Sequence, residues 1–442
     1  MIKFFSDIPK PRKKVLQKIR LAHLFLHFRQ ASIKMQDLII RFPHLPEQIF
    51  LKLDNGSLFK CREVTKLWQN LINERNSPWM RIVNIPTILK KQNNYLHLAA
   101  KTGQMHAFKK AFWETEDKNI KNECDETSFH LACKNGRTGV VKIFFENAAK
   151  FGIDLNITAK LGWTAFHDAC NKGHSDVVKT FMESAAALNI DLNKGSNKGW
   201  TAFHIACNGC HSDVVKILME NSAALSIDLN KQSNTGVTAF HSVCKKGHSD
   251  IFKIFMENAD ILKIDLNKEA DSDMTAFHSA CIKGHLDIVK MFMENAAALK
   301  IDLNKKANNG VTAFHSACFK GHSDVVKTFL ENATSLSIDL NKKANNGGTA
   351  FHDACCQGHS DVVKIFLENA TLLIVDLDVK GNFGKTALKL ACKLDHKHIV
   401  ELFLSSADFM KNFDNRDFKM ITSYYPVVFM EGRKFLDIWN EF

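Results

Sequence analysis

The residues best suited to chemistry in this sequence of 442 residues are cysteines and histidines set a few positions apart. The run Cys207–His211 reads CNGCH, which matches the spacing of a haem c attachment site. Its two thiols, Cys207 and Cys210, could instead form a redox pair or contribute to a zinc site. A pair such as His167 and Cys170 could supply half of a zinc site, or a nucleophile with its base. Taken alone, these patterns leave catalytic, metal-binding and structural roles open.

The positions of these residues along the chain favour a structural role. One cysteine recurs every 37 residues, and these cysteines are Cys133, Cys170, Cys207, Cys244, Cys281, Cys318, Cys355 and Cys392. The CNGCH run is one copy of a recurring C-x-x-G-H segment, with Cys210 in the glycine position. Stacked helices lie about 8–10 Å apart, farther than the Cα separation of about 4.4–6.8 Å that a disulfide needs. We therefore interpret the ladder cysteines as small buried side chains, and predict no cofactor and no metal.

No other motif indicates an enzyme. The sequence lacks the phosphate-binding G-x-x-x-x-G-K-[ST] run, the dinucleotide-binding G-x-G-x-x-G run and the zinc motif H-E-x-x-H. No pair of carboxylates and no nucleophile–base–acid set departs from the repeating background. We expect a protein that is not an enzyme and has no small-molecule substrate.

The elements that must position these residues follow from one repeating unit. The string TAFH or a variant recurs every 37 residues, with its third residue at Phe129, Phe166, Phe203, Phe240, Phe277, Phe314, Phe351 and Leu388. An earlier copy lies around Leu96. In the unit 307–340, Thr312 is a good helix N-cap, apolar residues then follow at helical spacing, and Gly321 ends this first helix. Ser323 opens a second helix. Neither helix can bury its apolar face alone, so neighbouring units must stack.

This unit resembles the ankyrin repeat, whose pattern is a turn, T-P-L-H-x-A, then G-H and two apolar pairs. Here alanine replaces the proline, phenylalanine replaces the leucine, and the unit is four residues longer than the usual 33. The resemblance implies an all-α ankyrin-repeat solenoid, built from helix–turn–helix units with short turn or hairpin connections and a small N-terminal helical module. It also implies that the recurring histidine ties the turn to the helix. We place about nine repeats in residues 84–408.

The net positive charge of the chain comes from its N-terminal 91 residues. Residues 1–91 hold 18 Lys and Arg against 6 Asp and Glu, whereas the remainder is balanced at 41 against 41. The array is thus neutral, which does not favour nucleic acid as a partner. We find no signal peptide and no run of 18 apolar residues, so we expect no membrane span and a location in the cytosol or nucleus.

Residues 45–83 do not follow the repeat and resemble an F-box, the helical module that docks on the Skp-type adaptor of cullin–RING ubiquitin ligases. The resemblance implies an adaptor-binding set of Leu45, Pro46, Ile49, Leu58, Val64 and Trp68. The first helix is about three residues shorter than the family pattern. The alternative interpretation is a helical cap on the open end of the stack.

The two ends of the chain also leave the repeat. Residues 1–44 form a basic segment, in which Lys10–Lys14 could act as a nuclear import signal. Residues 409–442 are aromatic and predict a capping segment, because the end of a solenoid exposes an apolar face. A second partner-binding peptide is the alternative for this C-terminal segment.

A protein partner is expected on the concave face, because partners of ankyrin arrays generally lie on the turn tips and the first-helix face. Matching the family pattern gives the candidates Trp163, Trp200, Lys172, Lys246, Met274, Lys283, Phe319 and Lys320. Tryptophans on a polar surface are favoured anchors, and the lysines predict an acidic stretch on the partner. The tryptophans could instead pack on their own turns.

Together these features predict an interaction adaptor. The leading hypothesis is a substrate receptor of an SCF-type ubiquitin ligase, in which the F-box binds the adaptor and the repeats hold the substrate. The alternative is an ankyrin scaffold or effector without a ligase link.

Overall fold

A computed structural model describes residues 95–373, 375–382, 384–406 and 415–424 of the chain. Within these ranges the regular structure is helical, and β-pairing is limited to isolated bridges from Lys121 to Thr127 and from Thr158 to Thr164. From Leu96 onward the chain forms one unit. The predicted all-α ankyrin-type fold is confirmed.

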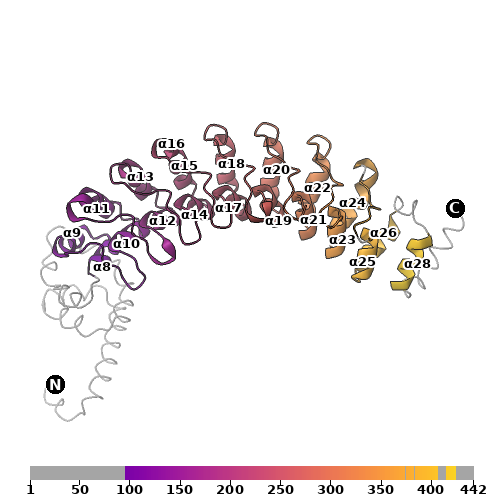
Figure 1. Ribbon diagram of the computed structural model, residues 1–442, viewed down its shortest axis with the longest axis horizontal. Coiled ribbons are helices and arrows are strands. Elements are labelled where there is room, and N and C mark those ends of the chain that lie inside the picture. Colours follow the sequence, from indigo (N-terminus) through magenta and orange to yellow (C-terminus); the bar gives the residue numbers. More distant parts are fainter. Residues whose placement is uncertain (1–94, 374, 383, 407–414, 425–442) are drawn as a thin grey trace, which may run out of the picture. The chain divides into compact units, whose positions relative to one another are not determined.

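The helices come in successive pairs that stack side by side. The first helices are α8 (Tyr95–Thr102), α10 (Ser128–Lys134), α12 (Ala165–Asn171), α14 (Ala202–Asn208), α17 (Ala239–Lys246), α19 (Ala276–Lys283), α21 (Ala313–Lys320), α23 (Ala350–Gln357) and α25 (Ala387–Lys393). The second helices are α9 (Met105–Glu114), α11 (Thr138–Phe151), α13 (Ser175–Ser184), α15 (Ser212–Glu220), α18 (Ser249–Asn258), α20 (Leu286–Asn295), α22 (Ser323–Asn332), α24 (Ser360–Leu373) and α26 (Lys397–Ser405). In the row of pairs, the first helices lie along the inner side and the second helices along the outer side (Figure 1).

The first helices from α10 to α23 begin where a threonine and a histidine cap them reciprocally. At α14, Thr201 is extended and its Oγ1 accepts from the His204 backbone N–H at 3.4 Å. His204 Nδ1 accepts in return from the Thr201 backbone N–H at 3.2 Å. Two backbone donors at the helix start are thereby satisfied, which fixes the first helix against its hairpin.

Glycine ends several first helices because the backbone there is left-handed and crowded. At Gly284 φ is +71°, and a Cβ would lie 2.5 Å from Nδ1 of His322 in the next repeat. A side chain at this position must displace that histidine and adopt a strained backbone, so glycine is favoured here.

The core between the two helix layers is a row of phenylalanines, interrupted at α15, where buried Leu218 takes the position of Phe181. Phe277 of α19 lies 5.0 Å from Phe292 of its own pair and 5.7 Å from Phe329 of the next pair, between ring centroids. All three rings are buried. Burying one such side chain contributes about 1.5–3 kcal/mol. Because each ring is shared between neighbours, one repeat depends on the next for its core.

The segment that makes the unit longer than 33 residues follows the second helix. In the repeat of α22, the chain continues past Asn332 as a further turn, with Leu336 N–H donating to the Asn332 carbonyl at 3.0 Å. This turn ends at Ser337, where φ is +51°. The additional residues of the unit therefore form a further turn after the second helix, which ends at a residue with left-handed backbone.

The last described helix, α28 (Asn415–Tyr424), packs against α25, and its Ile421 is fully buried. It covers apolar surface at the end of the stack. Residues 425–442 lie outside the described ranges, and a capping role for the whole of 409–442 stays a prediction.

Candidate functional site

The cysteines that could have formed a reactive centre lie in the interior of the stack. Cys207 is fully buried, and burial raises the pKa of its thiol well above the ordinary value. Cys210 is exposed, with φ of +59° in the position where other repeats have glycine, and its pKa is also raised, mainly by burial and then by Asp250. Neither thiol is activated as a thiolate. In the described ranges no three His, Cys, Asp or Glu side chains converge as metal ligands.

From α10 to α23 the first histidine joins its repeat to the next in six of the repeats, whereas Nε2 of His315 has no hydrogen-bond partner among the described residues. His204 Nδ1 accepts from Thr201, so Nε2 carries the proton and donates to the Val237 carbonyl at 3.0 Å. Equivalent bonds of 3.0–3.2 Å join His130 to Trp163 and His167 to Trp200. Burial lowers the pKa of His204 to about 4, so the imidazole is neutral at pH 7. The predicted structural role of these histidines is confirmed.

The second histidine, in the G-H pair, joins each repeat to the previous one. His211 Nε2 lies 2.9 Å from the Asn171 carbonyl, and His285 Nε2 lies 3.1 Å from the Lys245 carbonyl. The acceptor is in each case a carbonyl at the C-terminal end of the preceding first helix, where such groups lack partners within the helix. This ladder therefore pins the ends of neighbouring first helices to one another.

A third ladder, of asparagines, was missed by the sequence reasoning. Asn193 Nδ2 donates to the Ser226 carbonyl at 2.8 Å, and its Oδ1 accepts from the Asp228 backbone N–H at 2.8 Å. The ladder comprises Asn119, Asn156, Asn193, Asn230, Asn267 and Asn304. Asn156 to Asn304 repeat every 37 residues in the sequence, and that period could have identified them. The three ladders fix the spacing of the repeats and of the side chains on the inner face.

The two predicted tryptophan anchors lie at the hairpins before α12 and α14. Trp163 stacks beside His167 with ring centroids 6.2 Å apart, and Trp200 lies 5.9 Å from His204. Both indoles are half-buried. Among the described ring contacts none joins the two tryptophans, so they act as separate platforms, each braced by the capping histidine of its own turn.

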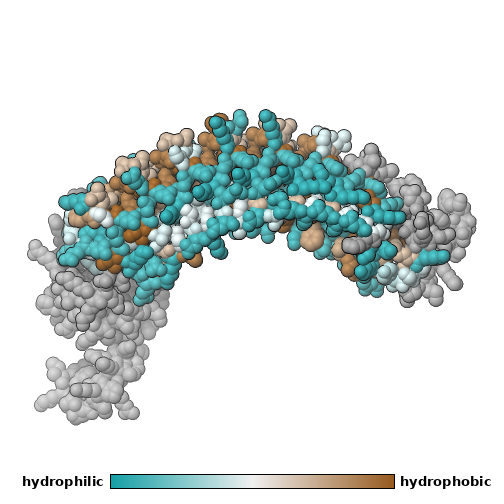
Figure 2. Space-filling view, in the orientation of Figure 1, coloured by the Kyte–Doolittle hydropathy of each residue, from teal (hydrophilic) through white to brown (hydrophobic). Residues whose placement is uncertain are grey.

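The other predicted partner residues cluster on α17, α19, α21 and the hairpins before them. Lys246, Lys283 and Lys320 are the last residues of these three first helices, and all three are exposed. Phe319 is 41% exposed and lies beneath the Lys320 ammonium, 5.2 Å from ring centroid to Nζ. Met274 is half-buried at the hairpin before α19. Lys172 is exposed but belongs to α12, two repeats before the α17 repeat. The visible side of the stack is largely hydrophilic, with hydrophobic residues toward the outer edge (Figure 2).

Two carboxylic acids on the first helices, one buried and one half-buried, were also missed. Asp168 follows the capping histidine of α12 and is only 5% exposed. Burial raises its pKa to about 7, an effect that Glu126 increases and that Lys134 and Lys172 oppose. Burial likewise raises the pKa of Asp353, in the same position of α23, to about 7. The same position holds Ser242, Ser279 and Ser316 in the central repeats, so the sequence pattern alone gave no sign of burial.

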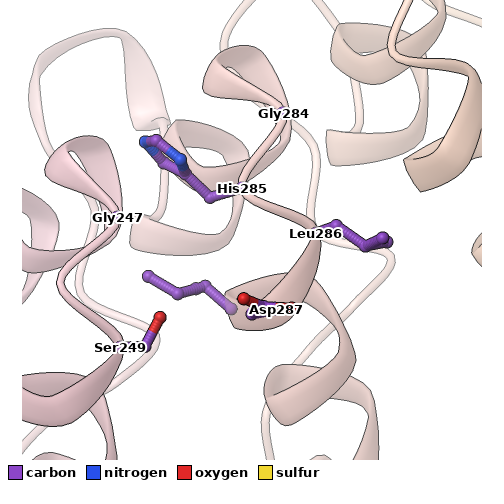
Figure 3. A pocket seen from close by; sticks show the side chains of 7 residues that line it. Gly247, Ser249, Gly284, His285, Leu286 and Asp287 are labelled. Atoms are coloured by element: carbon purple, nitrogen blue, oxygen red, sulfur yellow. The ribbon is translucent and has the colours of Figure 1, made fainter.

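A shallow depression of about 210 Å³ lies between the helix turns of two central repeats. Its walls come from Gly247, Ser249, Gly284, His285, Leu286 and Asp287 (Figure 3). His285 here is a ladder residue, bonded to Lys245 and packed against Gly247. The depression is therefore a consequence of how the repeats join, and its side chains do not converge as a catalytic set.

The predicted adaptor-binding residues Leu45, Pro46, Ile49, Leu58, Val64 and Trp68 lie outside the described residues. No helix among the described residues is both long and apolar enough to cross a bilayer.

A comparison with protein-family models agrees with this architecture. The family model "Ankyrin repeats (3 copies)" matches residues 96–194, 186–265, 259–343 and 332–417. No curated protein matches the chain. Among solved structures, the human ASB11 ankyrin repeat domain is 20% identical, with a TM-score of 0.43, over 54% of this chain and 98% of that chain. The ankyrin repeat domain of Bcl-3, a unique member of the IkappaB protein family, is 21% identical, with a TM-score of 0.44, over 50% of this chain and 93% of that chain.

Proposed function

This chain belongs to the ankyrin-repeat family, whose members are protein-interaction scaffolds, and we propose that its inner face holds a protein partner. The observation that carries the proposal is a contrast between rigid backbone and variable side chains. Three ladders of hydrogen bonds hold the repeats, while the inner positions differ from one repeat to the next. A preorganised surface loses little conformational entropy on binding, which favours affinity.

The variable positions offer the groups that protein interfaces use. Half-buried Trp163 and Trp200 and exposed Phe319 supply large apolar area with few rotatable bonds, and half-buried Met274 adds flexible apolar area. Exposed lysines end the helices α17, α19 and α21, one of them over the Phe319 ring, and can orient a charged partner. The concave surface of a solenoid is extended, so it suits an extended segment or a broad protein face.

Photo-crosslinking tests where the partner sits. A photoreactive amino acid placed at Phe319, on the inner face, should capture a partner in cells. The same group at Lys364, which is 61% exposed on the outer helix α24, is the matched control. Capture from Lys364 but not from Phe319 would place the partner on the outer face and refute this assignment.

For the full chain we propose a substrate receptor of an SCF-type ubiquitin ligase. The support is the spacing of Leu45, Pro46, Leu58, Val64 and Trp68, which resembles an F-box, joined to a long recognition surface. In this account the N-terminal module binds a Skp-type adaptor and the repeats present the substrate.

A pull-down with purified adaptor tests the ligase link. The full chain should retain the adaptor, and a double variant, Leu45→Ala with Pro46→Ala, should lose it. A matched variant, Phe319→Ala, should bind the adaptor as the parent does. If the double variant retains the adaptor as well as the parent does, or if the parent does not retain it, the ligase link is refuted. The protein would then be a scaffold without a ligase link.

A further inference from the structure

We infer that the inner face of α17, α19 and α21 binds an extended acidic protein segment that presents one carboxylate for about every three residues. The inference rests on the proposed partner-binding role of the inner face, and adds the chemistry and the register of the partner. Its basis is a row of lysines, Lys246, Lys283 and Lys320, called here the lysine row.

The lysine row carries charge that the protein itself does not neutralise. Among the described residues, none of the three ammonium groups has a carboxylate oxygen within 4.0 Å. Lysines elsewhere do: Lys327 lies 3.9 Å from Glu331, and Lys364 lies 3.9 Å from Glu368. The exposed aspartates nearest in sequence, at the starts of α18, α20 and α22, are Asp250, Asp287 and Asp324. The lysine row therefore places positive charge, unpaired within the described residues, at the C-terminal ends of α17, α19 and α21.

The fixed spacing of the row sets the register of what it can bind. Adjacent first helices pack directly on one another, which places their axes about 8–10 Å apart. An extended chain in the polyproline II conformation advances about 3.1 Å per residue and turns once every three residues, so one turn spans one repeat and every third side chain faces the same way. A segment with acidic side chains at positions i, i+3 and i+6 would meet the three lysines in turn.

Histidine bonds hold the backbone beside the row. His285 binds the carbonyl of Lys245, His322 binds that of Ile282, and His359 binds that of Phe319, at 2.9–3.1 Å. Each of these carbonyls immediately precedes a lysine of the row. The lysine Cα atoms are therefore held at the repeat spacing before any partner arrives, which lowers the entropic cost of a matched contact.

Apolar groups alongside the row favour a protein over a nucleic acid. Ile282 is half-buried and Phe319 exposed at the helix ends, while Val237, Met274 and Val311 are half-buried at the hairpins. A single lysine per repeat among such groups fits a segment in which acidic side chains are separated by apolar ones. Single-stranded nucleic acid binding relies on stacking platforms along a basic track, and Phe319 is the one exposed ring among these positions of α17, α19 and α21.

The helix α23 supplies a conservative substitution for the test. Its last residue, in the position of the row, is Gln357. Replacing all three lysines by glutamine therefore introduces a side chain that this fold already accepts there. The triple variant K246Q/K283Q/K320Q should fold as the parent does, which equilibrium unfolding checks. The matched control is K253Q/K290Q/K327Q, which removes the same charge from exposed sites on the outer helices α18, α20 and α22.

Fluorescence anisotropy with the full chain provides the measurement. The probe is a labelled peptide of about twelve residues with glutamate at every third position and apolar residues between, long enough to span three repeats. A second peptide of the same composition has its glutamates adjacent. The parent should bind the spaced peptide about tenfold more tightly. The inner triple variant should weaken that binding about 30- to 100-fold, and the outer triple variant less than about threefold.

The results that would overturn the inference are separable from failure of the proposed function. Equal binding of the two peptides, no detectable binding, or loss in both triple variants would refute the acidic register. Tighter binding of a labelled oligothymidylate, competing with the peptide, would assign the row to nucleic acid instead. Crosslinking from Phe319 could still capture a partner that binds the parent and K246Q/K283Q/K320Q equally well. In that case the partner-binding role of the inner face stands and only this inference fails.

Discussion

The interior of the stack and its inner face obey different rules within the same repeat. Inside, cysteine, phenylalanine and the capping histidine recur in nearly every repeat, because each must fill the same space and meet the same neighbour. On the inner face, the residue before the threonine changes from Trp163 to Val237 to Gly348. Repetition therefore marks the residues that hold the fold, and departure from repetition marks those available to a partner. The predictions that follow test this contrast.

Acid should produce the largest effect, because it acts on many interior histidines together. Burial lowers the pKa of His130, His167, His204 and His315 to about 4, against about 6.5 in an unfolded chain. The folded state then binds fewer protons, so stability is complete above pH 6.5 and is lost as the pH falls toward 4. Asp168 and Asp353 act oppositely, since their raised pKa favours the folded state as they protonate. We expect a net loss of roughly 5 kcal/mol between pH 7 and pH 4, measured by urea unfolding. A flat profile in a D168N/D353N variant, which lacks the two opposing carboxyl groups, would mean that the histidines are not buried and neutral.

Removing one shared core ring should cost nearly as much. Phe292 is fully buried and its ring centroid lies 4.8 Å from that of Phe252 and 5.0 Å from that of Phe277. Phe292→Ala leaves a cavity between two repeats and should lower the free energy of unfolding by about 3–5 kcal/mol. Phe319→Ala is the matched change on the inner face, and should stay within about 0.5 kcal/mol of the parent. Equal losses of unfolding free energy in the two variants would contradict the proposed difference between the interior and the inner face.

Replacing buried Asp168 on the first helix α12 should raise the free energy of unfolding, whereas the core substitution lowers it. Asp168→Asn removes a carboxylate whose charged form burial penalises, so the variant should be about 1–3 kcal/mol more stable at pH 8. The gain should shrink as the pH falls through 7, where the parent carboxyl takes up its proton. A gain that does not change with pH would show that charge burial is not its cause.

The smallest effect is expected at the irregular glycine position. Cys210 holds a left-handed φ of +59°, which a β-carbon disfavours. Cys210→Gly should stabilise the protein by about 0.5–1 kcal/mol, because relief of the native strain exceeds the entropy that glycine adds to the unfolded chain. The measurement is the urea midpoint, and destabilisation would show that the Cys210 side chain makes a contact of its own.

The features that could be predicted from the sequence are those that follow directly from the repeat period. A unit that cannot bury its own apolar face must repeat, so the cysteine and histidine ladders and the all-α solenoid followed from spacing alone. The burial of Asp168 did not follow, because it depends on neighbouring side chains at a position where other repeats hold serine. Whether Trp163 points to a partner or packs beside His167 of its own turn likewise depends on side-chain direction, which spacing does not give. The adaptor-binding set from Leu45 to Trp68 stays a prediction.

The most direct test of this account measures fold and binding in one preparation of K246Q/K283Q/K320Q. Urea unfolding should place its stability within about 1 kcal/mol of the parent, while anisotropy should show about 30- to 100-fold weaker binding of the spaced acidic peptide. That result would show that the lysines of the inner face determine peptide binding and that the stability of the fold depends on the interior residues instead. Unchanged peptide binding in the stably folded variant would contradict the account.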